Sequence, residues 1–367
     1  MRKIPDITAL RRGRSRGMSI VELLVASAIG IIASLAIFQV FAVFEGQKRT
    51  TASGGEAQTS GTLALYTIER DVRQGGYGFN TPDLIGCTLQ GWDQQTGAAL
   101  APSTLVPALI TQGPAGLPDT ITVAYGNGDA LPAPVSILVG SLGTTDDFVR
   151  IVNATYGYQP GEHVVIAEGG IPSCTLAQIS QTPATNGDNT RLDLQAGTYV
   201  NPYTLATLPT RYNNPAGLGT AYTASGKVYN IGPAPAIKVF SVQNAQLMSQ
   251  ALGTAAATPI FDNIAQLQAQ YGKDTNNDGV VDAFDETTPV TAAQWAQVLA
   301  MRIAVVARSG LYEKDEVSPA TIRLWADSAN PPTTTGPVWT LTADERHYRY
   351  KVFQTVIPLR NMIWRPY

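Results

Sequence analysis

The sequence has few of the residues that build most enzyme and metal sites. Its 367 residues include two histidines, His163 and His347, and two cysteines. This scarcity argues against a zinc site and against a cysteine–histidine catalytic pair. There is no G-x-S-x-G motif, and the one approach to a phosphate loop, at 225–228, lacks the first glycine and the final Ser/Thr. We therefore expect a protein that is not an enzyme.

Charged residues are also scarce, and they are unevenly placed. They make up 14% of the chain, against about 25% in ordinary soluble domains. Residues 1–17 carry six basic side chains and one acid, which leaves 19 basic and 27 acidic residues in the remainder. A basic leader on an acidic body is a signal of membrane topology. Because no other basic patch is interleaved with aromatic residues, we expect no nucleic-acid partner.

The segment 18–44 is a 27-residue apolar run, MSIVELLVASAIGIIASLAIFQVFAVF, in which Glu22 is the only charge. A helix needs about 20 residues to cross a bilayer, and a secretory signal has a shorter apolar region of about 7–15. The run therefore predicts a single transmembrane helix. The preceding arginines place residues 1–17 in the cytoplasm and send the body outward.

Glu22 is an unusual residue in such a helix. A carboxylate within a membrane costs at least about 2.5–3.5 kcal/mol. Either Glu22 lies near the interface and is solvated, or a positive charge on a neighbouring molecule pairs with it.

The residues around this acid resemble a known processing signal. Arg14-Ser15-Arg16-Gly17, followed by Met18-Ser19-Ile20-Val21-Glu22, is similar to the class III signal of type IV prepilins. That resemblance implies that a prepilin peptidase cuts after Gly17 and that the new amino terminus at Met18 is methylated. Met18 stands where the family usually has Phe. Glu22 would be the fifth mature residue, and pairing with a neighbour's amine would set the axial offset between subunits.

Beyond residue 44 the helical pattern continues on a more polar segment. Leu65, Ile68 and Val72 form an apolar stripe, whereas Gly54, Gly55 and Gly61 weaken the helix between 53 and 61. Four residues, 75–78, include three glycines and end it. From about residue 80, short strand-like runs alternate with loops at 120–125, 148–152, 163–167, 236–242, 301–308 and 348–357.

These patterns predict an α+β fold, in which a long N-terminal helix, with a transmembrane half and an amphipathic half, packs on an antiparallel β-sheet pilin body with large loop insertions. The expected division is a cleaved leader at 1–17, a transmembrane and filament-core helix at 18–44, an amphipathic helix with a connecting loop at 45–79, and an extracytoplasmic body at 80–367.

Two internal segments carry a more specific resemblance, to one family within the type IV pilins. LYTIERDVRQGGYGF at 65–79 and VIPLRN at 356–361 resemble the PilW family of minor pilins. That resemblance implies a low-abundance subunit that primes pilus assembly at or near the tip, in support of twitching motility and adhesion. The implied partners are other minor pilins, the major pilin, the prepilin peptidase and the inner-membrane assembly platform. The chain would sit in the inner membrane with its body in the periplasm, and then move to the pilus and the cell surface.

Two other functions remain open from the sequence. One is a minor pseudopilin of a type II secretion system, which shares the same signal. The other is a membrane-anchored extracytoplasmic binding protein or adhesin whose body recognises a ligand.

An acidic segment after residue 273 has the spacing of a calcium loop. Counting Asp274 as position 1, oxygen-bearing side chains follow at 3, 5, 9 and 12, with Gly279 at position 6 and the backbone carbonyl of Val280 at position 7. This is the pattern of an EF-hand loop in which Asp replaces the usual final Glu. We expect a structural calcium ion here, without a full helix–loop–helix because Pro289 limits the exiting helix; the alternative is a solvated acidic turn. The predicted ligands are Asp274, Asn276, Asp278, Val280, Asp282 and Asp285.

The two cysteines, Cys87 and Cys174, are expected to form a disulfide, because an extracytoplasmic compartment is oxidising. The alternative is a pair of buried thiols.

Overall fold

The structure is a computed structural model, and it describes residues 17–114, 116–128, 133–138, 142–154, 156–254, 256–325 and 336–363. Residues 1–16, which hold most of the predicted leader, lie outside the described residues. The chain divides into two compact units, Met1–Ser53 and Gly54–Tyr367. They are called the first and second unit below.

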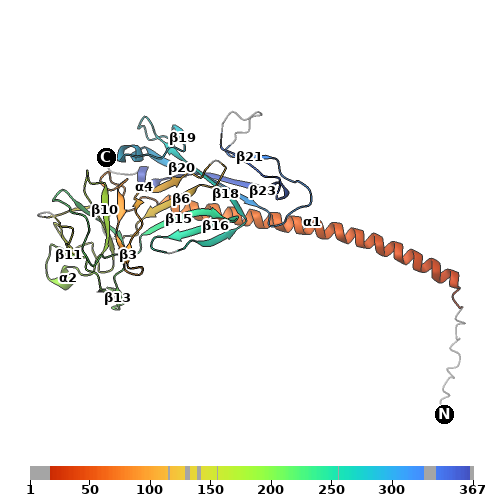
Figure 1. The fold of residues 1–367 in the computed structure, drawn as a ribbon, viewed down its shortest axis with the longest axis horizontal. Helices are drawn as coiled ribbons and strands as arrows, with labels where there is room; N and C mark the ends of the chain where they lie inside the picture. The colour runs from red at the N-terminus through yellow and green to blue at the C-terminus, as the bar shows by residue number, and fades with distance from the viewer. Residues whose placement is uncertain are drawn as a thin grey trace, which may run out of the picture. The chain divides into compact units, whose positions relative to one another are not determined.

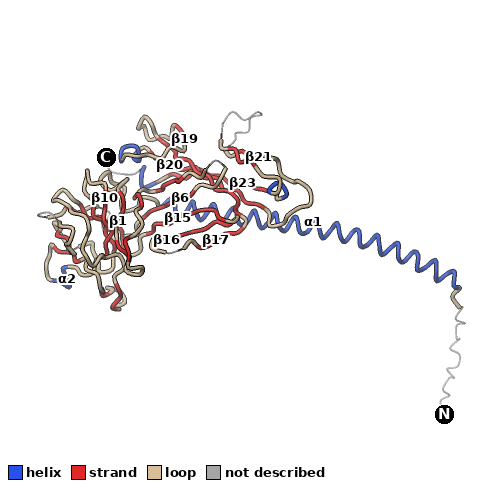
Figure 2. Tube along the Cα trace, in the orientation of Figure 1, coloured by secondary structure: helices blue, strands red, loops and turns tan. Residues whose placement is uncertain are grey.

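The N-terminal helix α1 (Ile20–Gln74) belongs to both units (Figures 1 and 2). It is unbroken between 53 and 61, so the expected local weakening does not interrupt it. The glycines after Gln74 end it as predicted. Gly76 adopts φ +82°, a left-handed conformation that glycine tolerates at a helix end, and its N–H donates to the Ala124 carbonyl.

In the second unit, one face of α1 packs on two antiparallel sheets. Ala57, Ala64, Ile68 and Val72 of this face are buried in one core with residues of both sheets. Ile68 and Val72 belong to the predicted apolar stripe, which is thus confirmed. The α+β class is confirmed as well, with one long N-terminal helix and a sheet-rich body.

In the two sheets that carry α1, several neighbouring strands also follow one another in the chain. We call these two sheets, together with residues 54–74 of α1, the scaffold. The four-stranded sheet has the order β19 (Ala283–Asp285), β18 (Ile264–Lys273), β20 (Val298–Arg308), β23 (Tyr350–Pro358). The five-stranded sheet has the order β17 (Thr258–Asp262), β16 (Gln246–Ala251), β15 (Ala236–Gln243), β6 (Thr120–Tyr125), β5 (Ala108–Thr111).

A large insertion separates two neighbouring strands of the scaffold. β6 and β15 pair directly, with Tyr125 opposite Ala236, so residues 126–235 leave the sheet and return to the same place. We call these residues the inserted lobe. They include the predicted strands near 148–152 and 163–167, and they have a separate core that includes Ile151, Ile166 and Tyr222. The lobe is visible at the left of Figure 1, around β10 and β11.

A six-stranded sheet joins the lobe to segment 79–105. The lobe supplies four of its strands, and segment 79–105 supplies the other two. Its order is β4 (Ser103–Thr104), β1 (Thr88–Gln90), β10 (Ser173–Gln178), β9 (His163–Ala167), β14 (Lys227–Gly232), β7 (Val135–Ser136). The β1–β10 pair is parallel, whereas its other pairs are antiparallel.

Smaller elements decorate both regions. The two-stranded pairs are β2 (Trp92–Asp93) with β3 (Ala98–Ala99), β8 (Phe148–Arg150) with β11 (Arg191–Asp193), β12 (Thr198–Val200) with β13 (Thr207–Pro209), and β21 (Thr321–Arg323) with β22 (Val338–Thr340). The short helices are α2 (Pro183–Asn186), α3 (Ala292–Ala296), η1 (Glu345–His347) and α4 (Arg360–Ile363).

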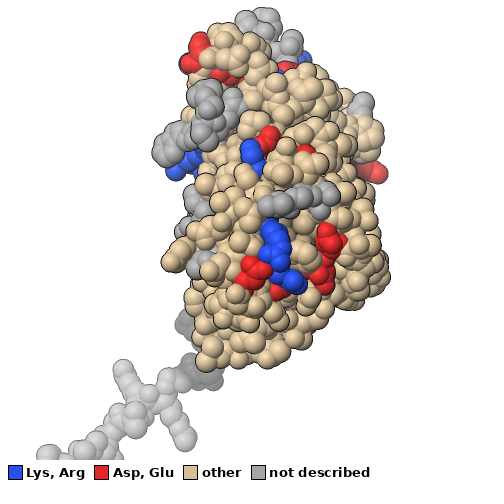
Figure 3. Space-filling view, turned by 90° about the vertical axis from the view of Figure 1, so that its left-hand side faces the viewer, with Lys and Arg blue, Asp and Glu red and all other residues tan. Residues whose placement is uncertain are grey.

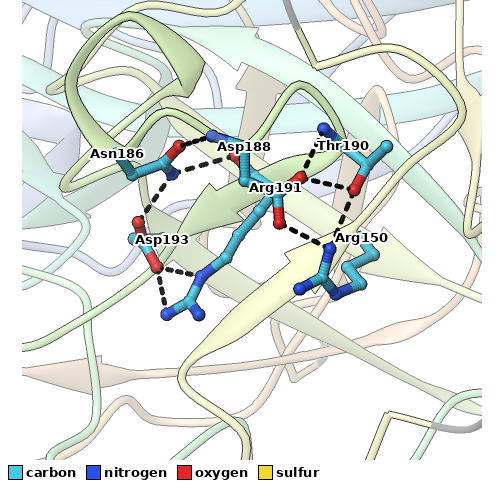
Figure 4. A network of polar contacts seen from close by, with 6 residues as sticks. All are labelled: Arg150, Asn186, Asp188, Thr190, Arg191 and Asp193. Atoms are coloured by element: carbon cyan, nitrogen blue, oxygen red, sulfur yellow. Dashed lines mark hydrogen bonds and ion pairs between the residues drawn. The ribbon is translucent and has the colours of Figure 1, made fainter.

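A polar network ties α2 and β11 to β8 inside the lobe (Figure 4). Arg150 Nη1 donates to Asp188 Oδ2 at 2.6 Å and to the Thr190 hydroxyl at 2.9 Å, and Arg191 Nε donates to Asp193 Oδ1 at 2.6 Å. Hydrogen bonds from the Thr190 amide and hydroxyl, together with Arg150, lower the pKa of Asp188 to about 2. These contacts hold the segment that follows α2 against β8.

Candidate functional site

The predicted processing and assembly residues lie at the start of α1. Gly17 and Met18 are exposed and precede the helix, and Glu22 lies in its first turn. The Ser19 hydroxyl accepts a hydrogen bond from the Val21 amide at 3.3 Å, which satisfies one of the free amides of the helix start. A carboxylate in this first turn also faces the positive end of the helix dipole.

The apolar half of α1 is exposed wherever the structure describes its side chains. From residue 17 to residue 49 every side chain that the structure describes is exposed. Helix α1 is long and apolar enough to cross a membrane, by length and composition, with a mean hydropathy of 2.4 in its most apolar window. So large an apolar surface needs a lipid or protein environment, because such patches are otherwise rare on soluble proteins.

A buried ion pair fixes the other half of α1 to the five-stranded sheet of the scaffold. Asp71 is 1% exposed, and its Oδ2 accepts from Lys238 Nζ of β15 at 2.8 Å. Its Oδ1 accepts from the Tyr125 hydroxyl of β6 at 3.3 Å. Burial opposes the charge of Lys238, but its own hydrogen bonds with Asp71 and Tyr125, together with the Asp71 charge, hold the pKa of its amine above the ordinary value. In the sequence, Asp71 stands out only as part of segment 65–79, and no local pattern predicts its pairing with Lys238.

Gly61 has a role that its sequence position did not predict, because it allows α1 to approach the sheet closely. Gly61 is buried on the packed face of α1, where a Cβ would come within 2.2 Å of Phe353 Cε2 and 3.0 Å of Ala307 Cβ. By contrast, a Cβ on Gly54 or Gly55 would meet nothing within 4 Å. Gly61 therefore lets the helix approach β20 and β23, and it is more than a weak point in the helix.

A buried carboxylate joins the two sheets of the scaffold. Asp119 is 1% exposed, accepts from the Gly113 amide and the Ala269 amide at 2.9 Å each, and precedes β6. Burial raises its pKa to about 6, against the effect of the two amides. No motif in the sequence marked this residue.

The predicted calcium ligands lie in the turn between β18 and β19, except Asp285, which is the last residue of β19. Asp274 is buried, and its two carboxylate oxygens accept from the amides of Asp278 at 3.1 Å and Gly279 at 2.8 Å. Asn276 Oδ1 accepts from the Asp278 amide at 2.9 Å, and Asp278 Oδ1 accepts from the Val280 amide at 2.8 Å. The structure thus brings Asp274, Asn276 and Asp278 together around the backbone of one turn.

The two later acids are engaged elsewhere. Asp282 Oδ2 accepts from the amide and hydroxyl of Thr275 at 2.8 Å each, and Asp285 pairs with Lys273 Nζ at 2.6 Å. Among the described residues, no three His, Cys, Asp or Glu side chains are grouped as they would be around a metal ion. The turn joins paired strands, so the expected absence of a helix–loop–helix agrees with the structure. Oxygen ligands suit calcium, but the calcium site stays a prediction.

Cys87 and Cys174 form the predicted disulfide, with their Cα atoms 5.8 Å apart. Cys87 follows α1 in segment 79–105, and Cys174 lies in β10 of the lobe. Both are buried in a core that the lobe shares with this segment. The bond therefore joins the inserted lobe covalently to the chain that leaves the helix.

One comparison with known proteins finds a family match in the C-terminal part of the chain. Residues 228–361 match the family PilW, Type IV Pilus-assembly protein W. The match begins in β14 and covers β15 to β23, including the acidic turn. Searches of curated proteins and of solved structures give no significant match. With this match over residues 228–361, which supports involvement in type IV pilus assembly, the chain is a PilW-like, type IV pilus-related protein.

Proposed function

We propose that this chain is a minor type IV pilin with a structural rather than an enzymatic role. The observation that carries the proposal is the combination of a PilW-matching scaffold with an apolar helix half that is exposed wherever it is described. Such a helix serves first as a membrane anchor and then as the part that packs into a filament. The subunit would prime pilus assembly at or near the tip with other minor pilins and the major pilin, on the inner-membrane platform, and so support twitching motility and adhesion.

Processing would take place at the exposed segment before α1. Gly17 and Met18 are open to a membrane peptidase because no other described residue covers them. Cleavage after Gly17 would create the amine at Met18, which is then methylated. The amine of a neighbouring subunit would pair with Glu22, and that pairing would offset the cost of about 2.5–3.5 kcal/mol of a lone carboxylate in the membrane.

A variant at the predicted cleavage point tests the processing step. Gly17→Leu should leave the full-length precursor in the membrane, whereas Gly13→Leu, a matched change inside the leader, should be processed normally. Mass spectrometry of the membrane fraction measures the amino terminus. Normal cleavage of Gly17→Leu would contradict the assignment of Gly17 as the residue before the cleavage point.

Complementation of a gene deletion tests the role in assembly. Wild-type protein should restore surface pili and twitching, whereas Glu22→Ala should be processed and inserted but assemble poorly. Glu45→Ala removes an exposed acid farther along the same helix and is the matched control. A deletion that keeps normal pili but loses exoprotein secretion would instead indicate a type II pseudopilin. Normal assembly with a lost ligand interaction would indicate a membrane-anchored binding protein.

We also propose that the β18–β19 turn binds a structural calcium ion through the six ligands predicted above. Support comes from the three oxygen-bearing side chains already gathered in one turn. At ten times its Kd, calcium would stabilise the folded state by about 1.4 kcal/mol. The full chain in detergent should therefore melt at a higher temperature with millimolar calcium than with chelator, and magnesium should substitute poorly. Asp274→Ala with Asp278→Ala should abolish the difference, and Asp344→Ala should keep it. An equal melting temperature in both conditions for the wild type would contradict the site.

A further inference from the structure

One hairpin of the inserted lobe presents apolar side chains to the outside. Strands β12 and β13 pair with Val200 opposite Thr207, and residues 203–209 at the turn and along β13 are all exposed. Tyr203 is 83% exposed and Leu205 is 78% exposed, with Val200 half-exposed beside them. We call residues 198–209 the tip hairpin. Figure 1 shows β13 near α2 and β11 at one end of the second unit, remote from β21 and β23.

The tip hairpin holds these side chains outward in a defined loop. Asn201 Oδ1 accepts from the amides of Tyr203 at 2.9 Å and Thr204 at 3.0 Å, and the Asn201 carbonyl accepts from the Leu205 amide at 2.9 Å. Leu205 has φ 57°, a left-handed conformation that is costly for leucine. The loop therefore exposes a large apolar side chain at a backbone position where glycine would be easier.

The tip hairpin also carries no charged side chain. Residues 194–210 contain no acidic, basic or histidine residue. The amides of Asn201 and Ala206 are bonded within the loop as well, to the Ala206 carbonyl at 2.9 Å and the Thr204 hydroxyl at 3.4 Å. Together with the three amides above, every backbone N–H from 201 to 206 has a partner inside the loop, since Pro202 has none to offer. Figure 3 shows that much of this end of the unit is free of charged side chains where it is described.

We propose that the tip hairpin inserts into the surface of a lipid bilayer other than the one that holds α1. A segment can enter hydrocarbon only when its backbone donors are satisfied internally and it carries no charge, and residues 201–206 at the turn of the tip hairpin meet both conditions. Tyrosine suits the bilayer interface, because its ring is apolar and its hydroxyl reaches water. A protein partner would more often use charges, and this hairpin has none. The proposal does not depend on the role in pilus assembly.

Capture of vesicles by the full-length protein tests the proposal. The chain is reconstituted into immobilised proteoliposomes through α1, and fluorescent protein-free vesicles of zwitterionic phosphatidylcholine are added. Many copies act together, so a weak insertion by each tip is detectable. Wild-type protein should capture the vesicles equally well in low salt and in about 1 M NaCl, where charge–charge attraction is screened within about 3 Å.

Two matched pairs of substitutions locate the contact. Tyr203→Ser with Leu205→Ser should reduce capture at least about tenfold, because it removes most of the apolar area that enters the lipid. Val152→Ser with Tyr156→Ser removes exposed apolar side chains elsewhere in the same lobe and should leave capture unchanged. Equal melting temperatures in detergent and equal outward orientation, measured by protease accessibility, make the variants comparable.

Several outcomes would overturn the proposal. Unchanged capture by Tyr203→Ser with Leu205→Ser would show that another surface binds the vesicles. Loss of capture in salt, or a requirement for anionic lipid, would show binding through charge. An absence of capture by the wild type would exclude lipid as the occupant, whether or not the protein assembles into pili.

Discussion

The scaffold and the inserted lobe differ in how they are held together. The scaffold shares one core between α1 and its two sheets, and the family match covers β15 to β23 of it. The lobe leaves and rejoins the scaffold between two paired strands, has a core of its own and lies outside the match as far as residue 227. A folded insertion of this kind can change its surface without disturbing the sheet that carries it. We therefore propose that the scaffold serves assembly and that the lobe contacts the surroundings.

Removal of the disulfide should produce the largest difference in stability between the lobe and the scaffold. Cys87→Ala with Cys174→Ala should lower the free energy of unfolding of the lobe by about 4 kcal/mol, because the bond closes a loop of 87 residues in the unfolded chain. Limited proteolysis should then cut within 126–235 while the scaffold stays intact. Equal protease resistance with and without the bond would show that the lobe does not depend on it.

Loss of the buried ion pair should instead weaken the scaffold. Asp71→Ala leaves Lys238 half-buried without its partner and should cost about 2–4 kcal/mol, less than for a fully buried pair because the Lys238 side chain keeps 29% of its exposure. Hydrogen exchange should report the loss in α1 and β15, with the lobe unaffected. Asp71→Asn with Lys238→Met should recover part of the stability. A cost below about 0.5 kcal/mol would mean that apolar packing alone holds α1.

Acidification should lower the stability of the lobe and raise that of the scaffold. Burial lowers the pKa of His163, in the lobe, from 6.5 to about 4, so its contribution to stability is present above pH 6.5 and is lost as the pH falls towards 4. Burial raises the pKa of Asp119, in the scaffold, from 3.8 to about 6, so its contribution is present below pH 3.8 and is lost as the pH rises through 6. Each change is roughly 2–3 kcal/mol.

Hydrogen exchange measured between pH 4 and pH 7 checks this opposition. On acidification, β9 should lose protection relative to His163→Gln, and β6 with β18 should gain protection relative to Asp119→Asn. Parallel pH profiles for each variant and the wild type would contradict the assignment to these two groups.

The smallest predicted effect concerns the fit of α1. Gly61→Ala should destabilise the scaffold by about 1–2 kcal/mol, because the clash with Phe353 outweighs the gain of about 1 kcal/mol in helix propensity. Gly55→Ala, at an open position of the same helix, should stabilise it by up to about 1 kcal/mol. Denaturant unfolding measures both, and Phe353→Leu should relieve the Gly61→Ala defect. Stabilisation by Gly61→Ala would show that the close approach is not required.

The sequence was most informative where neighbouring residues determine structure. The period of Ile68 and Val72 predicted the packed face of α1, and the glycines after Gln74 predicted its end. Strand positions were also predicted, with small shifts: β23 runs over Tyr350–Pro358 rather than 348–357. Local periodicity suffices for such elements because each is set by its own side-chain pattern.

Local periodicity could not predict which residues far apart in the sequence come into contact. The opposition of Tyr125 and Ala236, which makes residues 126–235 an insertion, joins strands far apart in the chain. The role of Asp71 depends on Lys238, and the role of Gly61 depends on Phe353; neither partner is near in sequence. In the acidic turn, spacing predicted six ligands, but it could not show that Lys273 would pair with Asp285.

The amino terminus of the chain in sheared pili is the most direct test of the central claim. The proposal is that a subunit processed at Gly17 enters the filament through α1. Mass spectrometry of purified sheared pili should therefore find this chain, with a methylated N-terminal peptide that begins at Met18, and Glu22→Ala should remove it from the pili while leaving it processed in the membrane. A chain that is absent from the pili and keeps its leader in the membrane fraction would contradict the account.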